Sequence, residues 1–222
     1  MDAKQDLPEP GSAWRNALTL GLVAVMGTGL LAGVNQLTRQ RVENQERRAA
    51  LVQLGQLLPS SRYDNALQED SYSFRDAIWF PSGQTITVYR ARLGSEPVAA
   101  IFRLAATDGY NGDINLLIGI NLDGSLTGVR VLSHKETPGL GDPIETAKSN
   151  WILTFSGRSL TNPAKDGWAV KSDGGQFDQF TGATITPRAV VKAVRITLEY
   201  FAANNDLVFA HPAAGLQNAN PR

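Results

Sequence analysis

The segment 178–187 combines hydroxyl side chains with a glycine and leads directly into a helical pattern. Pro187 suits the first position of a helix, and Thr184 or Thr186 can cap it. Free backbone N–H groups and the positive end of the helix dipole meet at a helix amino terminus, so a phosphate placed on Thr184 would be stabilised there. Gly182 leaves the approach to that threonine open. On spacing alone, an ordinary helix cap remains the alternative.

A second segment, 134–142, contains a Pro-Gly turn that another glycine follows closely. Gly139 and Gly141 allow conformations and close approaches that a side chain would block. A flat ligand could lie against Leu140 while Thr137 and backbone groups hydrogen-bond its edge, as in pockets that are mostly apolar with a few placed polar groups. The alternative is a surface turn whose charged residues are solvated.

The composition excludes several kinds of site. The 21 Lys and Arg residues balance 21 Asp and Glu residues, so there is no basic field to attract nucleic acid. The chain has no cysteine, which rules out thiolate-bound iron–sulfur clusters and a catalytic thiol. With only His134 and His211, we expect no metal site built on several histidines. Any redox chemistry must therefore use a cofactor that needs no cysteine.

An uncharged apolar stretch, 17–34, stands near the amino terminus. Extended from Trp14 to Leu37 it reaches the usual length of a transmembrane helix, with Trp14 at one interface. The sequence thus predicts a tail over 1–13, an anchor over 14–37 and a connecting helix over 38–60. A cleaved signal peptide or a buried core helix is the alternative, although no small-residue cleavage site follows the stretch.

Charges that flank the stretch bear on its orientation. Lys4 and Arg15 precede it, and four arginines follow it, so the Lys and Arg count favours a cytoplasmic carboxyl-terminal side. That rule weakens when a long domain follows the anchor.

The rest of the chain predicts an α+β domain over 61–205, with an antiparallel sheet packed by helices, and a disordered tail over 206–222. Asp123-Gly124 is the strongest hairpin signal. A helix is expected from Pro187 to about Ala203, because Val191, Val194, Leu198 and Phe201 form an apolar stripe. The expected strands cover 85–91, 98–104, 114–122 and 126–132.

The two segments together resemble motifs of the FMN-binding domain family. Thr181-Gly182-Ala183-Thr184, preceded by Asp178, is similar to the family's flavinylation signature, and Glu136–Gly141 is similar to its second motif. The resemblance implies FMN bound covalently by a phosphoester to Thr184, installed by a flavin transferase that recognises Asp178. It also implies that the cofactor lies near a set of further residues: Thr181, Gly182, Ala183, Glu136, Thr137, Gly139, Leu140 and Tyr110.

From about Trp14 to Ala203, the chain resembles the G subunits of Rnf ferredoxin:NAD oxidoreductases, with 107–113 typical of that branch. The related C subunits of sodium-pumping NADH:quinone reductases are the alternative. The resemblance implies a redox subunit that is not an enzyme on its own, with other Rnf subunits and membrane lipid as partners. It also implies a bacterial inner-membrane location with a cytoplasmic tail and the flavin domain facing the periplasm.

Two other classes stay open on the residues alone. One is a hydrolase with Thr184 or Thr181 as nucleophile and His134 as base, although no third orienting group is evident. The other is a membrane-anchored sensing or structural domain without a redox cofactor.

Overall fold

The structure is a computed structural model that describes residues 14, 16–29, 33, 52 and 54–210. The chain divides into two compact units, Met1–Ala49 and Ala50–Arg222. In the first unit, residues 16–29 are helical. Among the described residues, no helix is both long and apolar enough to cross a membrane. The predicted tail over 1–13, much of the predicted anchor over 14–37 and most of the connecting helix over 38–60 lie outside the described residues.

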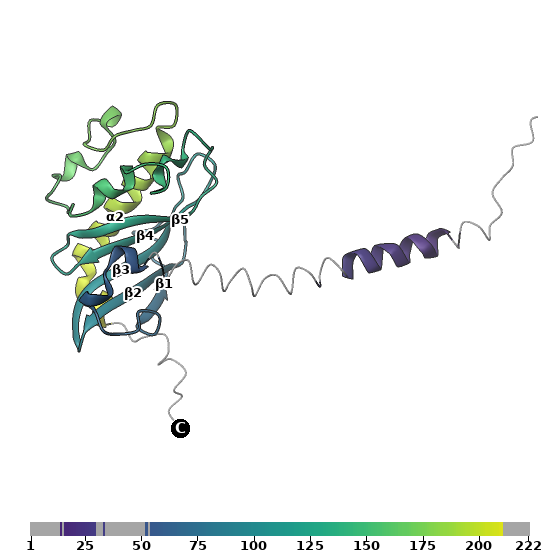
Figure 1. Ribbon diagram of the computed structural model, residues 1–222, viewed down its shortest axis with the longest axis horizontal. Coiled ribbons are helices and arrows are strands. Elements are labelled where there is room, and N and C mark those ends of the chain that lie inside the picture. The colour runs from purple at the N-terminus through teal and green to yellow at the C-terminus, as the bar shows by residue number, and fades with distance from the viewer. Residues whose placement is uncertain (1–13, 15, 30–32, 34–51, 53, 211–222) are drawn as a thin grey trace, which may run out of the picture. The chain divides into compact units, whose positions relative to one another are not determined.

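The second unit is built on an antiparallel sheet of five strands in the order β1-β2-β3-β4-β5 (Figure 1). Each strand therefore pairs with its neighbours in the sequence. The strands are β1 (Ser71–Phe74), β2 (Ile86–Leu93), β3 (Glu96–Ala106), β4 (Ile114–Asn121) and β5 (Leu126–Ser133). The antiparallel sheet is as predicted, and β2 to β5 correspond to the four expected strands. The first strand, β1, is not among those that the sequence predicts.

The Asp123-Gly124 turn joins β4 to β5, as predicted. Gly124 has a φ of 81°, a left-handed conformation that glycine adopts without a steric cost. The Asp123 carboxylate accepts hydrogen bonds from the backbone N–H and the hydroxyl of Ser125 at 2.9 and 2.6 Å. These bonds hold the pKa of Asp123 below its ordinary value. The turn chemistry thus stabilises the connection between the last two strands.

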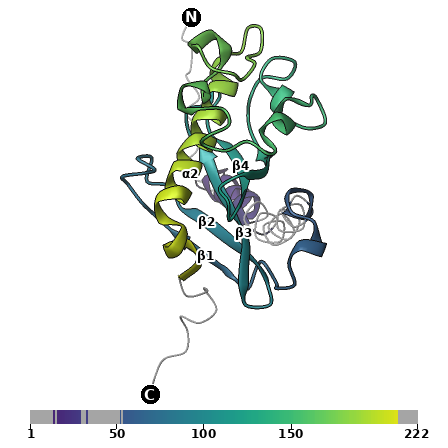
Figure 2. The same cartoon turned by 90° about the vertical axis from the view of Figure 1, so that its left-hand side faces the viewer.

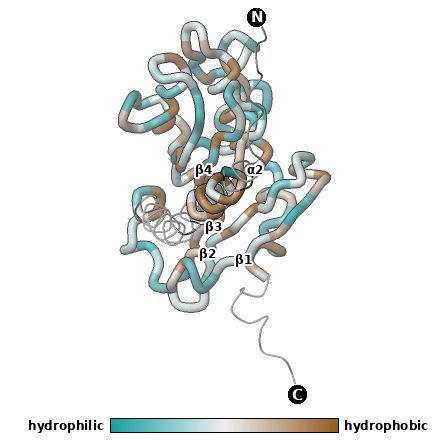
Figure 3. The backbone as a smooth tube through the Cα atoms, turned by 90° about the vertical axis from the view of Figure 1, so that its right-hand side faces the viewer, coloured by the Kyte–Doolittle hydropathy of each residue, from teal (hydrophilic) through white to brown (hydrophobic). Residues whose placement is uncertain are grey.

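A long helix, α2 (Ile185–Ala210), covers one face of the sheet (Figures 1 and 2). Its hydrophobic stretch lies next to those of β3 and β4 (Figure 3). Val190, Val194 and Leu198 are buried there together with Phe102 and Ile118 of the sheet. The amphipathic stripe in the sequence is therefore the core-facing side of the helix.

The helix extends beyond its predicted end at Ala203. Asn204 has a non-helical φ of −133°. The chain is helical again after this kink, up to Ala210. Val208, which is fully buried, and Phe209, which packs against the core, hold this last part of the helix in place. The first five residues of the predicted tail are thus helical, and 211–222 lie outside the described residues.

The opposite face of the sheet is covered by the chain before β1. Residues 54–57 are helical, which agrees with the carboxyl-terminal end of the expected connecting helix. Leu54, Leu57 and Leu58 are buried against Ile101 and Leu117 of the sheet. This part of the connecting segment thus belongs to the core of the second unit.

The segment between β5 and α2 is rich in turns, and it gathers beside the amino-terminal part of α2 (Figure 2). A cluster of aromatic side chains, which includes Trp151, Phe155, Trp168 and Phe177, gives it a core. Short 3-10 helices are η1 (Ser60–Arg62), before the sheet, and η2 (Asp142–Ile144), η3 (Trp151–Phe155), η4 (Lys165–Gly167) and η5 (Lys171–Asp173) in this segment. The segment is therefore ordered although it has little regular structure.

Candidate functional site

The two motifs found in the sequence line one cavity of about 250 Å³. It lies where the loop between β3 and β4, the loop after β5 and the amino terminus of α2 meet. Seven of the predicted site residues line it: Tyr110, Glu136, Thr137, Leu140, Gly182, Ala183 and Thr184. Gly141, the last residue of the second motif, also lines it, and two residues that the sequence does not predict as cofactor contacts complete the wall: Ile185 and Thr186. Segments far apart in the sequence thus form one site.

Thr184 immediately precedes α2. The backbone N–H of Arg188 donates to the Thr184 carbonyl oxygen at 3.2 Å, the first hydrogen bond of the helix. The sequence predicts Pro187 at the first helical position. Because α2 starts at Ile185, Pro187 is instead the third helical residue. Proline is tolerated at this position since the first four N–H groups have no intrahelical partner. Thr184 therefore stands at the positive end of the helix dipole.

A tight turn sets the position of Thr184. Gly182 has a φ of 80°, where a side chain would be strained. The backbone N–H of Ala183 donates to the carbonyl oxygen of Phe180 at 3.1 Å. The indole N–H of Trp151 donates to the carbonyl oxygen of Asp178 at 2.7 Å. The aromatic core after β5 thus holds the backbone just before the Thr181-Gly182-Ala183-Thr184 motif.

Glu136 is a buried carboxylate in the wall of the cavity, with 4% of its surface exposed. One carboxylate oxygen, Oε1, accepts a hydrogen bond from the backbone N–H of Asn111 at 3.0 Å. The other, Oε2, accepts one from the hydroxyl of Thr186. Both oxygens are therefore satisfied by groups on two other segments, which is what a buried carboxylate requires.

Backbone hydrogen bonds between its first and last residues hold the turn after Glu136. The backbone N–H groups of Leu140 and Gly141 donate to the Thr137 carbonyl oxygen at 3.1 and 3.0 Å. The Thr137 hydroxyl accepts a hydrogen bond from the Asn111 side-chain amide at 3.1 Å. Thr137, whose hydroxyl is predicted to hydrogen-bond the edge of a ligand, thus lines the cavity, and this hydroxyl already accepts one hydrogen bond from Asn111.

Three large apolar or aromatic side chains at the cavity are exposed. Tyr110 is 67% exposed, Leu140 46% and Ile185 43%. Exposing such side chains to water is unfavourable, and a group of them around a cavity is typical of a ligand or partner site. The cavity mouth therefore offers an apolar surface to a flat ring.

Three predicted residues do not line the cavity. Thr181 and Asp178 are exposed in the turn before it, where the Asp178 carboxylate lies 2.5 Å from the Lys171 ammonium. The backbone N–H of Gly139 donates to the Asp142 carboxylate at 2.7 Å, which shapes the turn from outside the cavity wall. Asp178 is thus accessible to a partner protein, and Gly139 acts through the backbone.

His134 does not fit the role of a base for Thr184. Its Nδ1 accepts a hydrogen bond from the backbone N–H of Glu136 at 3.0 Å, and its Nε2 lies 2.6 Å from a carboxylate oxygen of Glu145. Because Nδ1 accepts, Nε2 carries the proton and donates to Glu145. His134 lines a neighbouring polar cavity and not the one at Thr184. This geometry disfavours the hydrolase alternative.

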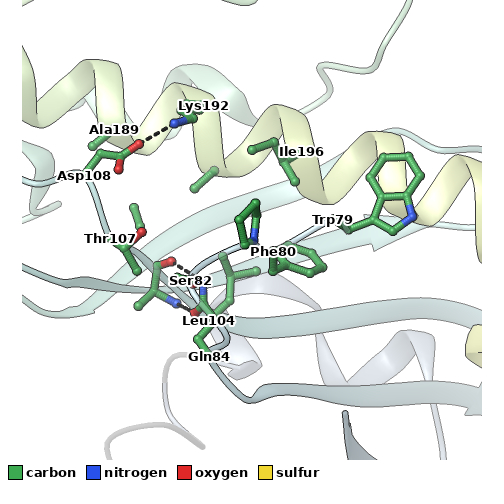
Figure 4. Close-up of a pocket in the computed structure, with 14 residues that line it drawn as sticks. Trp79, Phe80, Ser82, Gln84, Leu104, Thr107, Asp108, Ala189, Lys192 and Ile196 are labelled. Carbon is green, nitrogen blue, oxygen red and sulfur yellow. Dashed lines mark hydrogen bonds and ion pairs between the residues drawn. The ribbon is translucent and has the colours of Figure 1, made fainter. Parts of the chain in front are cut away.

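A larger cavity of about 340 Å³ lies further along α2 (Figure 4). Its charged residues, Lys192 and Asp108, pair with each other at 2.5 Å. The Gln84 side chain accepts from the Ala105 N–H at 2.6 Å and donates to the Ala105 carbonyl at 2.9 Å. Neither motif lines this cavity. The cavity at Thr184, which both motifs line, is therefore the candidate functional site.

Comparison with known proteins agrees with this choice. The FMN-binding domain family matches residues 109–199, a range that contains both motifs and all residues of the cavity. The RnfG N-terminal region matches residues 5–57, which include the apolar stretch.

Several relatives are similar over nearly their whole length, and each is named as the G subunit of an ion-translocating oxidoreductase complex. The relative from Pseudomonas aeruginosa is 50% identical over 206 residues, 92% of this chain and 96% of its own. The relative from Shewanella loihica is 47% identical over 199 residues, 90% and 94% of the two chains. That from Vibrio atlanticus is 43% identical over 198 residues, 89% and 94%. The chain therefore belongs to the family of G subunits of ion-translocating oxidoreductase complexes.

Proposed function

We propose that this chain carries FMN through a phosphoester bond to Thr184 and acts as an electron-transfer subunit of a membrane-bound, ion-translocating oxidoreductase complex of the Rnf type. The observation that carries the proposal is the meeting of two distant motifs in one cavity at a helix amino terminus. The match to the FMN-binding domain family over 109–199 supports the choice of cofactor.

The surroundings of Thr184 suit a phosphate. The first N–H groups of α2 have no intrahelical partner, and the dipole of a helix favours an anion at this end. Gly182 and Ala183 precede Thr184 and add little bulk to the approach. A phosphate on the Thr184 oxygen would therefore lie near the free N–H groups of Ile185 and Thr186 and in a favourable field.

The cavity also suits one part of an isoalloxazine ring. At about 250 Å³ it lies just below the usual range for ligand pockets, roughly 300 to 1,000 Å³, and so would enclose only part of the ring. Tyr110, Leu140 and Ile185 extend it as an exposed apolar surface. A ring held in this way would stay accessible at one edge, as transfer of electrons to and from partner proteins requires.

When bound, the flavin supplies the chemistry, because it exchanges electrons with both one-electron and two-electron carriers. The protein supplies the attachment point, the orientation and the charge around the ring. The negative charge of Glu136, buried in the cavity wall, would disfavour additional negative charge on a reduced ring and so lower its potential. A covalent bond keeps the cofactor in place through many turnovers.

Attachment requires a separate enzyme in this proposal, a flavin transferase that uses FAD. The Thr184 hydroxyl oxygen would form the bond to the FMN phosphorus, AMP would leave, and the hydroxyl proton would be lost. Asp178 would contribute to recognition, because its carboxylate is exposed near the attachment segment. His134 is not available as the base, since both of its ring nitrogens are engaged.

The test is flavin fluorescence of the denatured protein. The full chain is produced together with a flavin transferase and separated on a denaturing gel, where only covalently bound flavin stays with the band. We expect a fluorescent band for the wild type and for Thr181→Ala, and none for Thr184→Ala. Loss of only the cap should cost about 1 kcal/mol, so the Thr184 variant should still fold.

Two results would overturn the proposal. If the wild-type band lost its flavin on denaturation, attachment would not be covalent. If Thr184→Ala kept full fluorescence, the bond would lie elsewhere. A wild type without any flavin, bound or free, would favour the alternative of a sensing or structural domain.

For the location, we propose an anchor over 14–37 in the bacterial inner membrane with the flavin domain in the periplasm. The uncharged apolar stretch 17–34 and the match of 5–57 to the RnfG N-terminal region support it. The charge count around the stretch favours the opposite orientation. A reporter active only in the cytoplasm, fused to the carboxyl terminus, should stay inactive, and activity would reverse the proposed orientation.

The proposed partners are the other subunits of the complex, membrane lipid around the anchor, and the flavin transferase during maturation. The relatives are named as subunits of a complex, which supports the first of these. Purification of the tagged chain from its native membrane should bring the other subunits with it.

A further inference from the structure

One hydrogen bond ties the two motifs of the cavity to each other. Thr186 is fully buried and Glu136 is 4% exposed, and the Thr186 hydroxyl donates to Oε2 of Glu136. Thr186 lies two residues after Thr184, in the first turn of α2. Glu136 begins the segment that lines the other side of the cavity. The bond therefore joins the attachment side of the site to the ring side.

The Glu136 carboxylate has little freedom to move away from this bond. A Cβ atom on Gly109 would lie 3.0 Å from Oε1, and one on Gly141 would lie 3.0 Å from Oε2. The backbone N–H of Asn111 holds Oε1 at 3.0 Å. Three segments thus enclose the carboxylate, and the Thr186 hydroxyl is the contact that reaches it from α2.

We propose that Thr186 is a positioning residue for the flavin. Its hydroxyl fixes the first turn of α2 to the Glu136 carboxylate, so that the phosphate on Thr184 and the ring-lining segment keep one relative placement. This inference rests on the proposed attachment at Thr184. Thr186 itself is not the attachment point, because its hydroxyl is buried and engaged.

The helix contains a matched control for the loss of a buried threonine hydroxyl. Thr197 is also fully buried on α2, but its hydroxyl donates to the Ala193 carbonyl of the same helix at 2.8 Å. Thr186→Val and Thr197→Val remove the same group from the same kind of environment. Only the first of these bonds connects α2 to another segment of the site.

The first measurement uses the flavin-free full chain and follows amide hydrogen exchange. Thr186→Val leaves Oε2 of Glu136 without its donor, so the Asn111 amide should exchange faster than in the wild type by roughly tenfold or more. Thr186→Ser, which keeps the hydroxyl, should restore slow exchange. Thr197→Val should leave the Asn111 amide unchanged.

The second measurement uses the flavin-loaded full chain and follows circular dichroism in the visible bands of the flavin, per mole of bound flavin. Thr186→Val should lose at least half of this signal while Thr184 still carries flavin, because the ring no longer has one orientation. Thr186→Ser and Thr197→Val should keep it. Equal signals in Thr186→Val and Thr197→Val would overturn the proposal.

A third variant covers the case in which Thr186→Val fails to fold. In Glu136→Gln, the amide oxygen can accept from the Asn111 N–H and the amide N–H₂ can donate to Thr186, so the link survives without the charge. We expect exchange at Asn111 to stay slow, and fast exchange there would show that the charge and not the hydrogen bond holds the segments together. A wild type without flavin would refute the proposed attachment, and the exchange measurement would still decide the role of Thr186.

Discussion

Gly141→Ala should destabilise the protein, although its backbone conformation suits alanine. Gly141 has a φ of −97° and a ψ of −16°, which alanine adopts without strain. A Cβ atom at this position would lie 2.8 Å from the Glu136 Cβ, and 3.0 Å from both Glu136 Oε2 and the Thr186 hydroxyl. Carbon atoms prefer separations of about 3.5 to 4.0 Å, so the added methyl is too close by roughly 0.7 Å or more.

The expected cost follows from the surroundings of that methyl. Glu136 and Thr186 are buried and bonded to each other, so neither can swing away. Overpacking of this kind costs about 1 to 3 kcal/mol. In a chain of this size, each kcal/mol lowers the melting temperature by about 2 to 4 °C. We therefore expect Gly141→Ala to melt about 2 to 12 °C below the wild type.

Scanning calorimetry or thermal circular dichroism measures the shift, with Gly55→Ala as the control. Gly55 lies in a helical stretch, and a Cβ atom there would have nothing within 4 Å. Alanine is favoured over glycine in a helix by about 0.5 to 1 kcal/mol, so this variant should melt at or slightly above the wild-type temperature. A Gly141→Ala protein as stable as the Gly55→Ala protein would refute the close packing of the two motifs.

Two further predictions concern contacts outside the cavity. Gln84→Ala removes both side-chain hydrogen bonds to the Ala105 backbone and should lower the free energy of unfolding in urea by about 1 to 3 kcal/mol, whereas an unchanged midpoint would contradict the pairing. The hydrogen bond from Arg188, at 2.6 Å, holds the pKa of Asp173 below its ordinary 3.8. Because the folded pKa is the lower one, this pair stabilises the fold above pH 3.8 and the stabilisation is lost as the pH falls further. The melting temperatures of the wild type and Asp173→Asn should therefore converge below that pH, and a difference that grows on acidification would contradict the pair.

Much of the sheet and helix can be predicted from the sequence because their patterns are local. The alternation in β2 to β5, the Asp-Gly turn and the apolar stripe of α2 each depend on neighbouring residues. The sequence does not reveal β1, because Ser71–Phe74 is a strand of only four residues that pairs with β2 alone. The predicted end of the helix at about Ala203 coincides with the kink at Asn204, but the helical residues beyond the kink are not predicted, because Val208 and Phe209 are held by contacts with the core and not by a local pattern.

The members of the candidate site are easier to predict than its geometry. The motifs identify Thr184 and Glu136, but nothing local shows that Thr186 and Glu136 bond to each other, since this contact depends on how distant segments pack. The sequence alone predicts Thr186 only as a cap. Thr181 belongs to the signature but lies outside the cavity, which the spacing of the motif does not reveal. Thr184 and Thr186 are both good helix caps, so the sequence does not show after which of them the helix begins. The helix begins after Thr184, and Pro187 is therefore its third residue and not its first, as predicted from the sequence.

Mass spectrometry of one tryptic peptide decides whether FMN is bound covalently to Thr184. Trypsin releases residues 172–188 from the chain after Lys171 and Arg188, and this peptide contains Thr181, Thr184 and Thr186. After production with a flavin transferase, fragmentation of the peptide should place one FMN, less one water, on Thr184. An adduct on Thr181 or Thr186, or a peptide without any adduct, would refute attachment at Thr184.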